Sequence, residues 1–134
     1  MASRVLKCLT IFALFAWFTG GSVAGAQGIS KTVAAGGVLK LGHYTSVNPD
    51  CSLLGMPGVR VSAAPMHGVV RTMKTSGFSH FSAGAFDRCN TRRVAGVSVE
   101  YRPEKGFAGA DRFSLDIIYA SGRERTESFA ITVK

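Results

Sequence analysis

Residues 101–113, YRPEKGFAGADRF, constrain the fold of this chain more than any other segment. Pro103 ends a hydrogen-bonded strand ladder because it has no N–H to donate. Gly106 and Gly109 then supply the permissive backbone that a turn needs. The segment therefore predicts the end of one strand, a turn and the start of the next strand. It indicates a β architecture and contains no pattern of catalytic or metal-binding residues.

The first 26 residues have the layout of a cleaved secretory signal. Two basic residues lead into an apolar run over residues 9–18, and Ala24-Gly25-Ala26 fits the small-x-small pattern of a cleavage site. A membrane anchor is the alternative, but the run is shorter than the roughly 20 residues that a spanning helix needs. We therefore expect cleavage after Ala26, a single domain over residues 27–134, and export to the periplasm or the extracellular space.

The expected mature chain is basic. The whole sequence has 16 Lys and Arg against 8 Asp and Glu. Cleavage removes two basic residues, Arg4 and Lys7, and no acidic ones, which leaves 14 against 8 and a net charge of +6. This balance favours solubility and contact with anions. Nucleic acid is not expected as a partner, because the chain is predicted to be exported and has no nucleic-acid-binding motif.

Two cysteines, Cys51 and Cys89, remain after the expected cleavage. Exported domains with an even number of cysteines usually form disulfides, because the compartment beyond the membrane is oxidising. Neither cysteine lies in a CxxC motif, and no histidine lies at ligand spacing from either. We therefore predict a Cys51–Cys89 disulfide rather than a metal pair or a reactive thiol. Closing a loop of about 39 residues would stabilise the fold by roughly 4 kcal/mol in the chain-entropy model.

Short alternating runs bounded by Gly, Pro, Asn and Ser recur along the mature chain, and no long stretch has helical periodicity. About seven such runs predict an all-β, antiparallel β-sandwich. The expected strands are residues 31–35, 38–42, 59–63, 69–74, 96–103, 111–119 and 124–133. We expect residues 43–57 to be mostly loop and residues 76–93 to form an irregular, inserted loop.

Alternation within these runs predicts which side chains face the core, since successive residues of a strand point to opposite faces. The expected inward residues are Leu39, Leu41, Val59, Val61, Val97, Val99, Tyr101, Phe113, Leu115, Ile117, Phe129, Ile131 and Val133. Glu100 and Asp116 are expected to face solvent. Phe107, between two glycines, is expected to seal one end of the core.

Three segments carry a recognisable pattern. They read Pro65-x-x-Gly68-Val69-Val70, then Val99-x-Tyr101-x-Pro103-x-x-Gly106-Phe107-x-Gly109-x-Asp111-x-Phe113, then Phe129-Ala-Ile-Thr-Val133. The pattern resembles the bacterial cadherin-like, Ig-like repeat family. The resemblance implies an Ig-like or cadherin-like antiparallel sandwich outside the cytoplasm, in a protein that serves adhesion, spacing or binding at the bacterial surface.

The chain also departs from that family. Family members usually occur as tandem arrays, whereas this sequence has one domain behind a signal. The segment 76–93 and the disulfide that it would carry are lacking in most members. The acidic clusters that bind calcium between cadherin domains have no counterpart here. Asp111 is therefore interpreted as a turn-capping residue, and no metal or other cofactor is expected.

Basic and aromatic residues gather within segment 76–93. Arginine suits bidentate contact with carboxylate or phosphate. The leading hypothesis is a non-catalytic binding or adhesion-type module of the bacterial envelope, which contacts an anionic partner through this disulfide-pinned loop. The alternative is that the arginines form an ordinary solvated face. The candidate contact residues are Arg88, Arg92, Arg93, Phe78, Phe81 and Phe86.

Three further hypotheses belong to other classes. The chain could be a structural subunit that assembles through an edge strand at residues 129–134. It could be a periplasmic copper-binding protein, since His67 lies beside Met66 and thioether and imidazole suit copper; otherwise Met73 is assigned to the core. An enzyme is not expected, because no GxSxG motif occurs and the Ser79-His80 neighbours do not make a triad.

Overall fold

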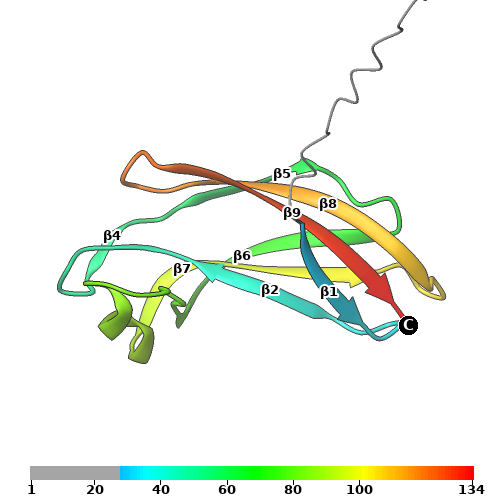
Figure 1. The fold of residues 1–134 in the computed structure, drawn as a ribbon, viewed down its shortest axis with the longest axis horizontal. Coiled ribbons are helices and arrows are strands. Elements are labelled where there is room, and N and C mark those ends of the chain that lie inside the picture. Colours follow the sequence, from blue (N-terminus) through cyan, green and yellow to red (C-terminus); the bar gives the residue numbers. More distant parts are fainter. Residues whose placement is uncertain (1–27) are drawn as a thin grey trace, which may run out of the picture.

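The computed structural model describes residues 28–134, so the predicted signal at residues 1–26 lies outside the described part. The described chain is all-β with one short 3-10 helix, η1 (Figure 1). The elements are β1 (Ile29–Val33), β2 (Leu39–Tyr44), β3 (Ser46–Val47), β4 (Leu53–Gly55), β5 (Gly58–Ala63), β6 (Gly68–Phe78), η1 (Asp87–Thr91), β7 (Arg93–Pro103), β8 (Gly109–Ile118) and β9 (Glu124–Val133).

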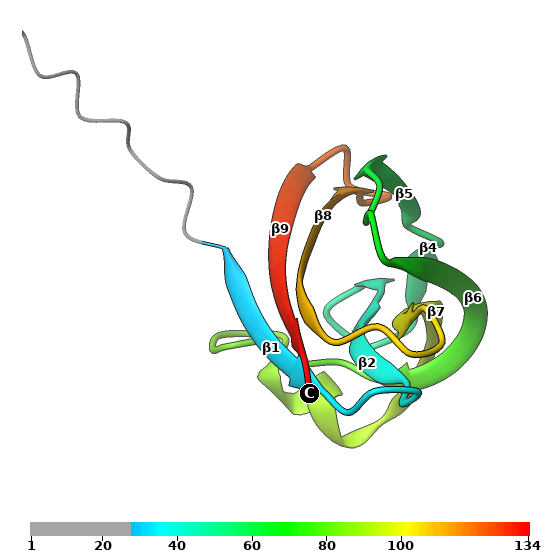
Figure 2. The same ribbon diagram turned by 90° about the vertical axis from the view of Figure 1, so that its right-hand side faces the viewer.

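Two sheets face each other in a sandwich-like arrangement (Figure 2). One has the order β1-β9-β8-β5 and the other has the order β2-β7-β6. Strands β1 and β9 pair in parallel, and the other pairs in these sheets are antiparallel. A separate small pair, β3-β4, lies at one end. The prediction of an all-β chain with a sandwich-like fold is confirmed at this level.

The strand boundaries differ from the prediction in two places. Residues 43–57 were expected to be mostly loop, but they hold the end of β2 and the whole of β3 and β4. Strand β6 continues to Phe78 and β7 begins at Arg93, which pair with each other in the same ladder. The irregular segment therefore spans residues 79–92 rather than 76–93, and we call these residues the pinned loop.

The core follows the alternation of the central strands β7, β8 and β9. All nine side chains that the sequence assigned inward on these strands are buried, which confirms that part of the prediction: Val97, Val99, Tyr101, Phe113, Leu115, Ile117, Phe129, Ile131 and Val133. Three aromatic rings form a column through this core. The ring of Phe113 lies 5.5 Å from that of Tyr101 on the facing sheet and 4.9 Å from that of Phe129 on the neighbouring strand. Leu39, Leu41 and Val59 pack against the core from its border.

Three predicted positions are wrong. Val61 shares the inward phase of its partner Leu115 but is exposed because β5 is a sheet edge. Met73 is exposed because it pairs with Ser98, in the outward phase of the sheet. Asp116 was expected to face solvent but is buried. Its carboxylate accepts hydrogen bonds from Arg60 (2.9 Å) and Thr126 (2.9 Å), and these bonds lower the pKa of Asp116. Alternation assigned its face correctly, but these neighbours cover it.

A buried carboxylate, Asp111, ties the two sheets together at one end of the molecule. Asp111 lies on β8 and is 4% exposed. Its Oδ2 accepts a hydrogen bond from the Tyr101 hydroxyl on the facing sheet at 2.8 Å. The same carboxylate accepts the backbone N–H groups of Met66 (2.9 Å), His67 (3.0 Å) and Arg112 (2.9 Å). Asp111 thus caps the turn between β5 and β6, which lies far from it in sequence.

The glycines of the motif make room for aromatic rings around this carboxylate. A Cβ on Gly68 would lie 2.4 Å from the Tyr101 ring, so only glycine fits beneath it. Phe107 is half-buried against the core, as expected, and its ring stacks on His67 at 4.2 Å. Gly106 has φ +79, which favours glycine, in the turn before Phe107. The motif of residues 101–113 therefore serves to build this end of the fold.

Asp111→Asn should destabilise the protein and weaken its sensitivity to acid. Burial alone would raise the pKa of Asp111, but the four hydrogen bonds outweigh it and hold the pKa below its usual range. A depressed pKa contributes stability that is present above the unfolded value, about 3.9, and lost as the pH falls below it. We expect Asp111→Asn to lower the free energy of unfolding by about 2 kcal/mol or more at pH 7.

Denaturant melts between pH 7 and pH 2.5 provide the measurement, and the difference between wild type and Asp111→Asn should shrink toward low pH. Asp87→Asn is the matched control, because Asp87 is an exposed carboxylate whose replacement should leave stability nearly unchanged. A constant difference across the pH range would show that ionised Asp111 does not stabilise the fold.

Candidate functional site at the pinned end

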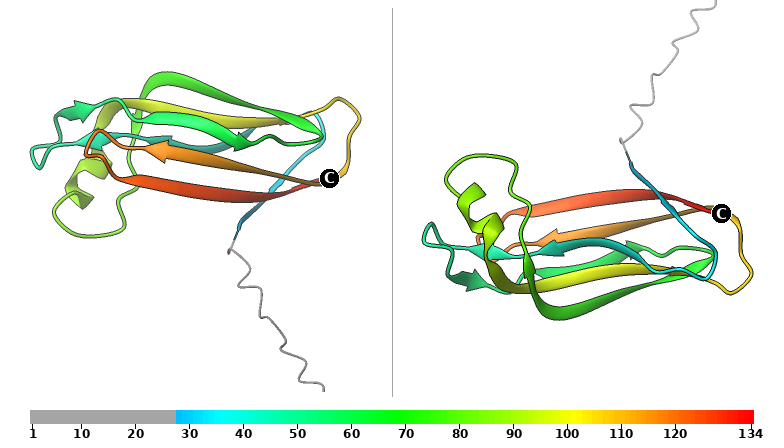
Figure 3. Two further views of the ribbon diagram at one scale, coloured as in Figure 1. Left: turned by 90° about the horizontal axis from the view of Figure 1, so that it is seen from above. Right: turned by 90° about the horizontal axis from the view of Figure 1, so that it is seen from below.

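A second, smaller core holds the pinned loop against the sandwich. Cys51 and Cys89 form the predicted disulfide, with their Cα atoms 5.4 Å apart. Cys89, in η1, is fully buried, and Val47 of β3 and Val94 of β7 pack with the disulfide. Phe81 covers this cluster from the loop. The loop lies at the end of the molecule opposite to the C-terminus, which we call the pinned end (Figure 3).

Hydrogen bonds give the pinned loop an internal frame. The side-chain amide of Asn90 in η1 bridges both backbone groups of Phe81: its Oδ1 accepts the Phe81 N–H at 2.9 Å, and its Nδ2 donates to the Phe81 carbonyl at 2.9 Å. The Cys89 N–H donates to the Phe86 carbonyl at 2.9 Å. These bonds fix the start of the loop against η1.

The three arginines predicted to contact a partner are all exposed, but they lie at two places. Arg88 and Arg92 border a small pocket beside Asp50 and the disulfide. Arg88 donates a hydrogen bond to the Pro49 carbonyl. Hydrogen bonds from Ser52 lower the pKa of Asp50, and the charge of Arg88 lowers it further. Arg93 lies on β7, where it donates to the Ser76 carbonyl at 2.8 Å.

The three predicted phenylalanines also lie at two places. The Arg93 guanidinium lies 5.9 Å from the centre of the exposed Phe78 ring, in cation–π geometry. Phe81 and Phe86 lie together, with ring centres 5.7 Å apart. The predicted contact residues therefore form three pairs around the pinned end: Arg88 with Arg92, Arg93 with Phe78, and Phe81 with Phe86.

Phe81 and Phe86 line a larger hollow with a volume of about 820 Å³. It lies between the pinned loop and segments of both sheets, and we call it the hollow. Strand β1 contributes Ile29 and Lys31 to its lining, and β9 contributes Arg125, Glu127 and Phe129. Residues 41–49, from β2 through β3 and the loop that follows, complete this part of the lining. Its lining is mixed: aromatic and aliphatic side chains such as Phe81, Phe86 and Leu41 are interspersed with many polar and charged ones.

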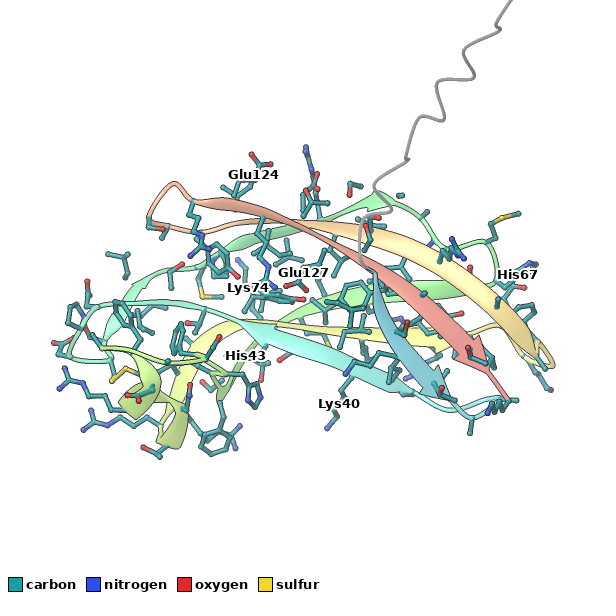
Figure 4. All side chains as sticks on the ribbon, viewed as in Figure 1. Lys40, His43, His67, Lys74, Glu124 and Glu127 are labelled. Atoms are coloured by element: carbon teal, nitrogen blue, oxygen red, sulfur yellow. A yellow bond between two sulfur atoms is a disulfide. The ribbon has the colours of Figure 1, made fainter. Side chains whose placement is uncertain are left out.

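An ion pair between a buried carboxylate, Glu127, and an exposed arginine, Arg125, stands at one wall of the hollow. Glu127 is 9% exposed, and its side chain points from β9 toward the space between the sheets, whereas Glu124 points away (Figure 4). Glu127 Oε1 lies 3.1 Å from Arg125 Nη2 in an ion pair, and Glu127 Oε2 accepts a hydrogen bond from the Tyr44 hydroxyl at 2.6 Å. Burial raises the pKa of Tyr44, and the bond to Glu127 raises it further, so the phenol stays a neutral donor.

Ser79 borders the hollow at the start of the pinned loop. Its side chain is almost completely buried. Among residues 28–134, its hydroxyl is the one buried side-chain oxygen or nitrogen without a hydrogen-bond partner. A buried polar group without a partner costs free energy, which makes Ser79 an unusual feature of this wall.

Arg125, Glu127 and Tyr44 were not singled out from the sequence, although a signal for two of them was present. Phe129, Ile131 and Val133 define the inward face of β9, and the same alternation continued backwards assigns Glu127 and Arg125 to that face. Charged residues in the inward phase of a strand mark a buried polar site. The partners from β2 and from the pinned loop come from distant sequence and gave no such signal.

The other candidate residues occupy separate places. Strand β9 lies between β1 and β8, so residues 129–134 are not an edge strand, and that prediction is wrong. His67 stacks on Phe107, while Met66 and Met73 are exposed on the turn before β6 and on β6. His43 on β2 is held by Ser98 (3.0 Å) and the Val94 carbonyl (3.1 Å).

Residues 28–134 contain no group of three or more His, Cys, Asp or Glu side chains placed to hold a metal ion. Within the same part of the chain, no helix has the length and apolar character needed to cross a membrane.

Comparisons with solved structures find distant similarity. No family model matches the chain, and no curated protein matches it. A solved structure titled "Solution Structure of Amebosin" is similar over 78% of this chain and 88% of that chain, with 13% sequence identity and a TM-score of 0.43. This similarity is too distant to indicate a function.

Replacing both cysteines by alanine should lower the free energy of unfolding by roughly 4 kcal/mol, because the disulfide closes a large loop in the unfolded chain. The two residues are 38 apart in sequence. Urea denaturation of the oxidised protein and of Cys51→Ala/Cys89→Ala measures the loss. A loss below about 1 kcal/mol would mean that the disulfide does not anchor the loop.

Tyr44→Phe should destabilise the protein by about 2 kcal/mol, because the Glu127 carboxylate would lose a hydrogen bond while remaining buried. Thermal melts at neutral pH provide the measurement. Tyr119→Phe is the matched control: Tyr119 also borders the hollow, but Glu127 has no hydrogen bond from it. Equal effects of the two substitutions would contradict a specific role for the Tyr44 bond.

Proposed function

We propose that this protein is an exported, non-catalytic binding or adhesion-type module of the bacterial envelope, which contacts an anionic partner through the arginines of its pinned end. The partner class is an acidic surface polysaccharide. Arginine is suited to this role because its planar guanidinium forms paired hydrogen bonds with carboxylates.

An Ig-like topology is part of this proposal. In Ig-like sandwiches the second, fifth and fourth strands share one sheet, and the third, sixth and seventh share the other. Without the short β3 and β4, the orders β2-β7-β6 and β9-β8-β5 have that arrangement here. The motif around Tyr101 and Asp111 supports a relation to cadherin-like repeats. It is the part of the sequence that resembles those repeats, and its residues pack together at one end of the fold.

One observation carries the binding role: exposed arginines stand on a segment that is held rigidly. The disulfide, the second core and the Asn90 bridge restrain the pinned loop. Arg88 and Arg92 are exposed beside the disulfide, and Arg93 follows at the start of β7. Side chains on a restrained backbone lose less conformational entropy on binding than those on a free loop. The disulfide also supports export, since such bonds persist in oxidising compartments.

Removing the three arginines should abolish retention on an anionic polysaccharide. We expect Arg88→Gln/Arg92→Gln/Arg93→Gln to elute from an alginate column at much lower salt than wild type, with nearly unchanged thermal stability. Salt dependence is part of the expectation, because exposed charges are screened at high ionic strength.

The matched control removes the same amount of charge elsewhere. Lys40→Gln/Arg71→Gln/Lys105→Gln replaces three other exposed cations, and Figure 4 shows Lys40 pointing away from the molecule. This variant should keep most of the retention. If the two triple variants elute together, net charge alone explains retention and the pinned end is not a dedicated surface.

A further inference from the structure

We propose that the hollow is a second binding site, which takes an amphiphile with an apolar body and a single anionic head group. This goes beyond the proposed polysaccharide contact, because it uses other residues and another chemical class of ligand. The inference depends on the size and lining of the hollow, on the cations at its border and on the unpartnered Ser79 hydroxyl.

The size and lining suit a small amphiphile. Small-molecule sites commonly have volumes of roughly 300–1,000 Å³, with apolar walls and few polar groups. The hollow, at about 820 Å³, lies within that range. Phe81, Phe86 and Leu41 offer apolar contact, and the exposed Leu54 extends this surface. An acyl chain or a fused aromatic body would cover side chains that are now partly in contact with water.

The charges of the lining favour an anion. Lys31 and Arg125 are cations, while Glu127 is the acidic residue among the lining side chains. Arg125 uses one nitrogen, Nη2, on Glu127, which leaves further N–H donors of its guanidinium for a ligand. Glu127 is engaged on both oxygens, by Arg125 and by Tyr44, so its charge is compensated within the protein. Lys31 at the border then adds an uncompensated positive charge.

Ser79 supplies an independent indication. Its buried hydroxyl borders the hollow and has no partner among the described residues. A ligand oxygen that reached this hydroxyl would satisfy it, and satisfying a buried polar group contributes to affinity.

Two fluorescent probes with a common aromatic body test this proposal. Anilinonaphthalene sulfonate (ANS) carries one anionic group, and N-phenylnaphthylamine (NPN) has the same rings without it. Titrated into the oxidised mature protein, residues 27–134, ANS should bind with one-to-one stoichiometry and about tenfold more tightly than NPN. Decanoate should displace ANS, and decanol should do so much less effectively.

Variants locate the site. Arg125→Gln should reduce ANS affinity by about tenfold and leave NPN affinity nearly unchanged. Because Arg125→Gln leaves Glu127 less well paired, Lys31→Gln is the second variant, and it should reduce the ANS preference without affecting folding. Phe86→Ser should weaken both probes. Arg92→Gln is the control and should affect neither probe, although it weakens retention on alginate.

Four outcomes would overturn the proposal: no binding of either probe, equal affinity for both probes, unchanged ANS affinity in both Arg125→Gln and Lys31→Gln, or loss of ANS binding in Arg92→Gln. The last would place the anion on the arginine surface instead. Because the polysaccharide contact is measured with other residues on another ligand, either site can fail while the other stands.

Discussion

The fold depends first on one buried carboxylate. Asp111 accepts a hydrogen bond from Tyr101 on the facing sheet and from two backbone amides of the turn before β6. It thereby connects both sheets and the crossover between them at a single point. The tight motif around it follows from this role: Gly68 lies under the Tyr101 ring, and Phe107 stacks on the turn at His67. These residues secure the fold and leave no free chemistry at that end.

The opposite end is built on a different principle. There the disulfide replaces the large core that a loop of this composition cannot form, since the pinned loop consists mostly of small and polar residues. The pinned end has two kinds of surface, the exposed arginines Arg88 and Arg92 and the hollow. The proposed binding role places function on loops held by a rigid scaffold, as in many proteins.

The sequence predicted the central strands well and the edges poorly, for a physical reason. Alternation on β8 and β9 identified buried residues such as Leu115 and Ile131, because these central strands have a neighbouring strand at both edges and one face packed on the core. On the edge strand β5 the same reasoning failed for Val61, since periodicity assigns a face but not what covers it. The disulfide was predictable from cysteine count and expected export. The hollow was not, because its wall joins Tyr44, Ser79 and Glu127 from distant parts of the chain.

The proposed function places the anionic ligand at the pinned end rather than on the outer face of the β2-β7-β6 sheet. Amide chemical-shift mapping of ¹⁵N-labelled protein titrated with a short, acidic oligosaccharide tests it most directly. We expect shifts confined to Asp50, Cys51 and residues 88–93, with no change around Asp111. Shifts centred on Lys40 and Arg71 of the outer sheet face would contradict it.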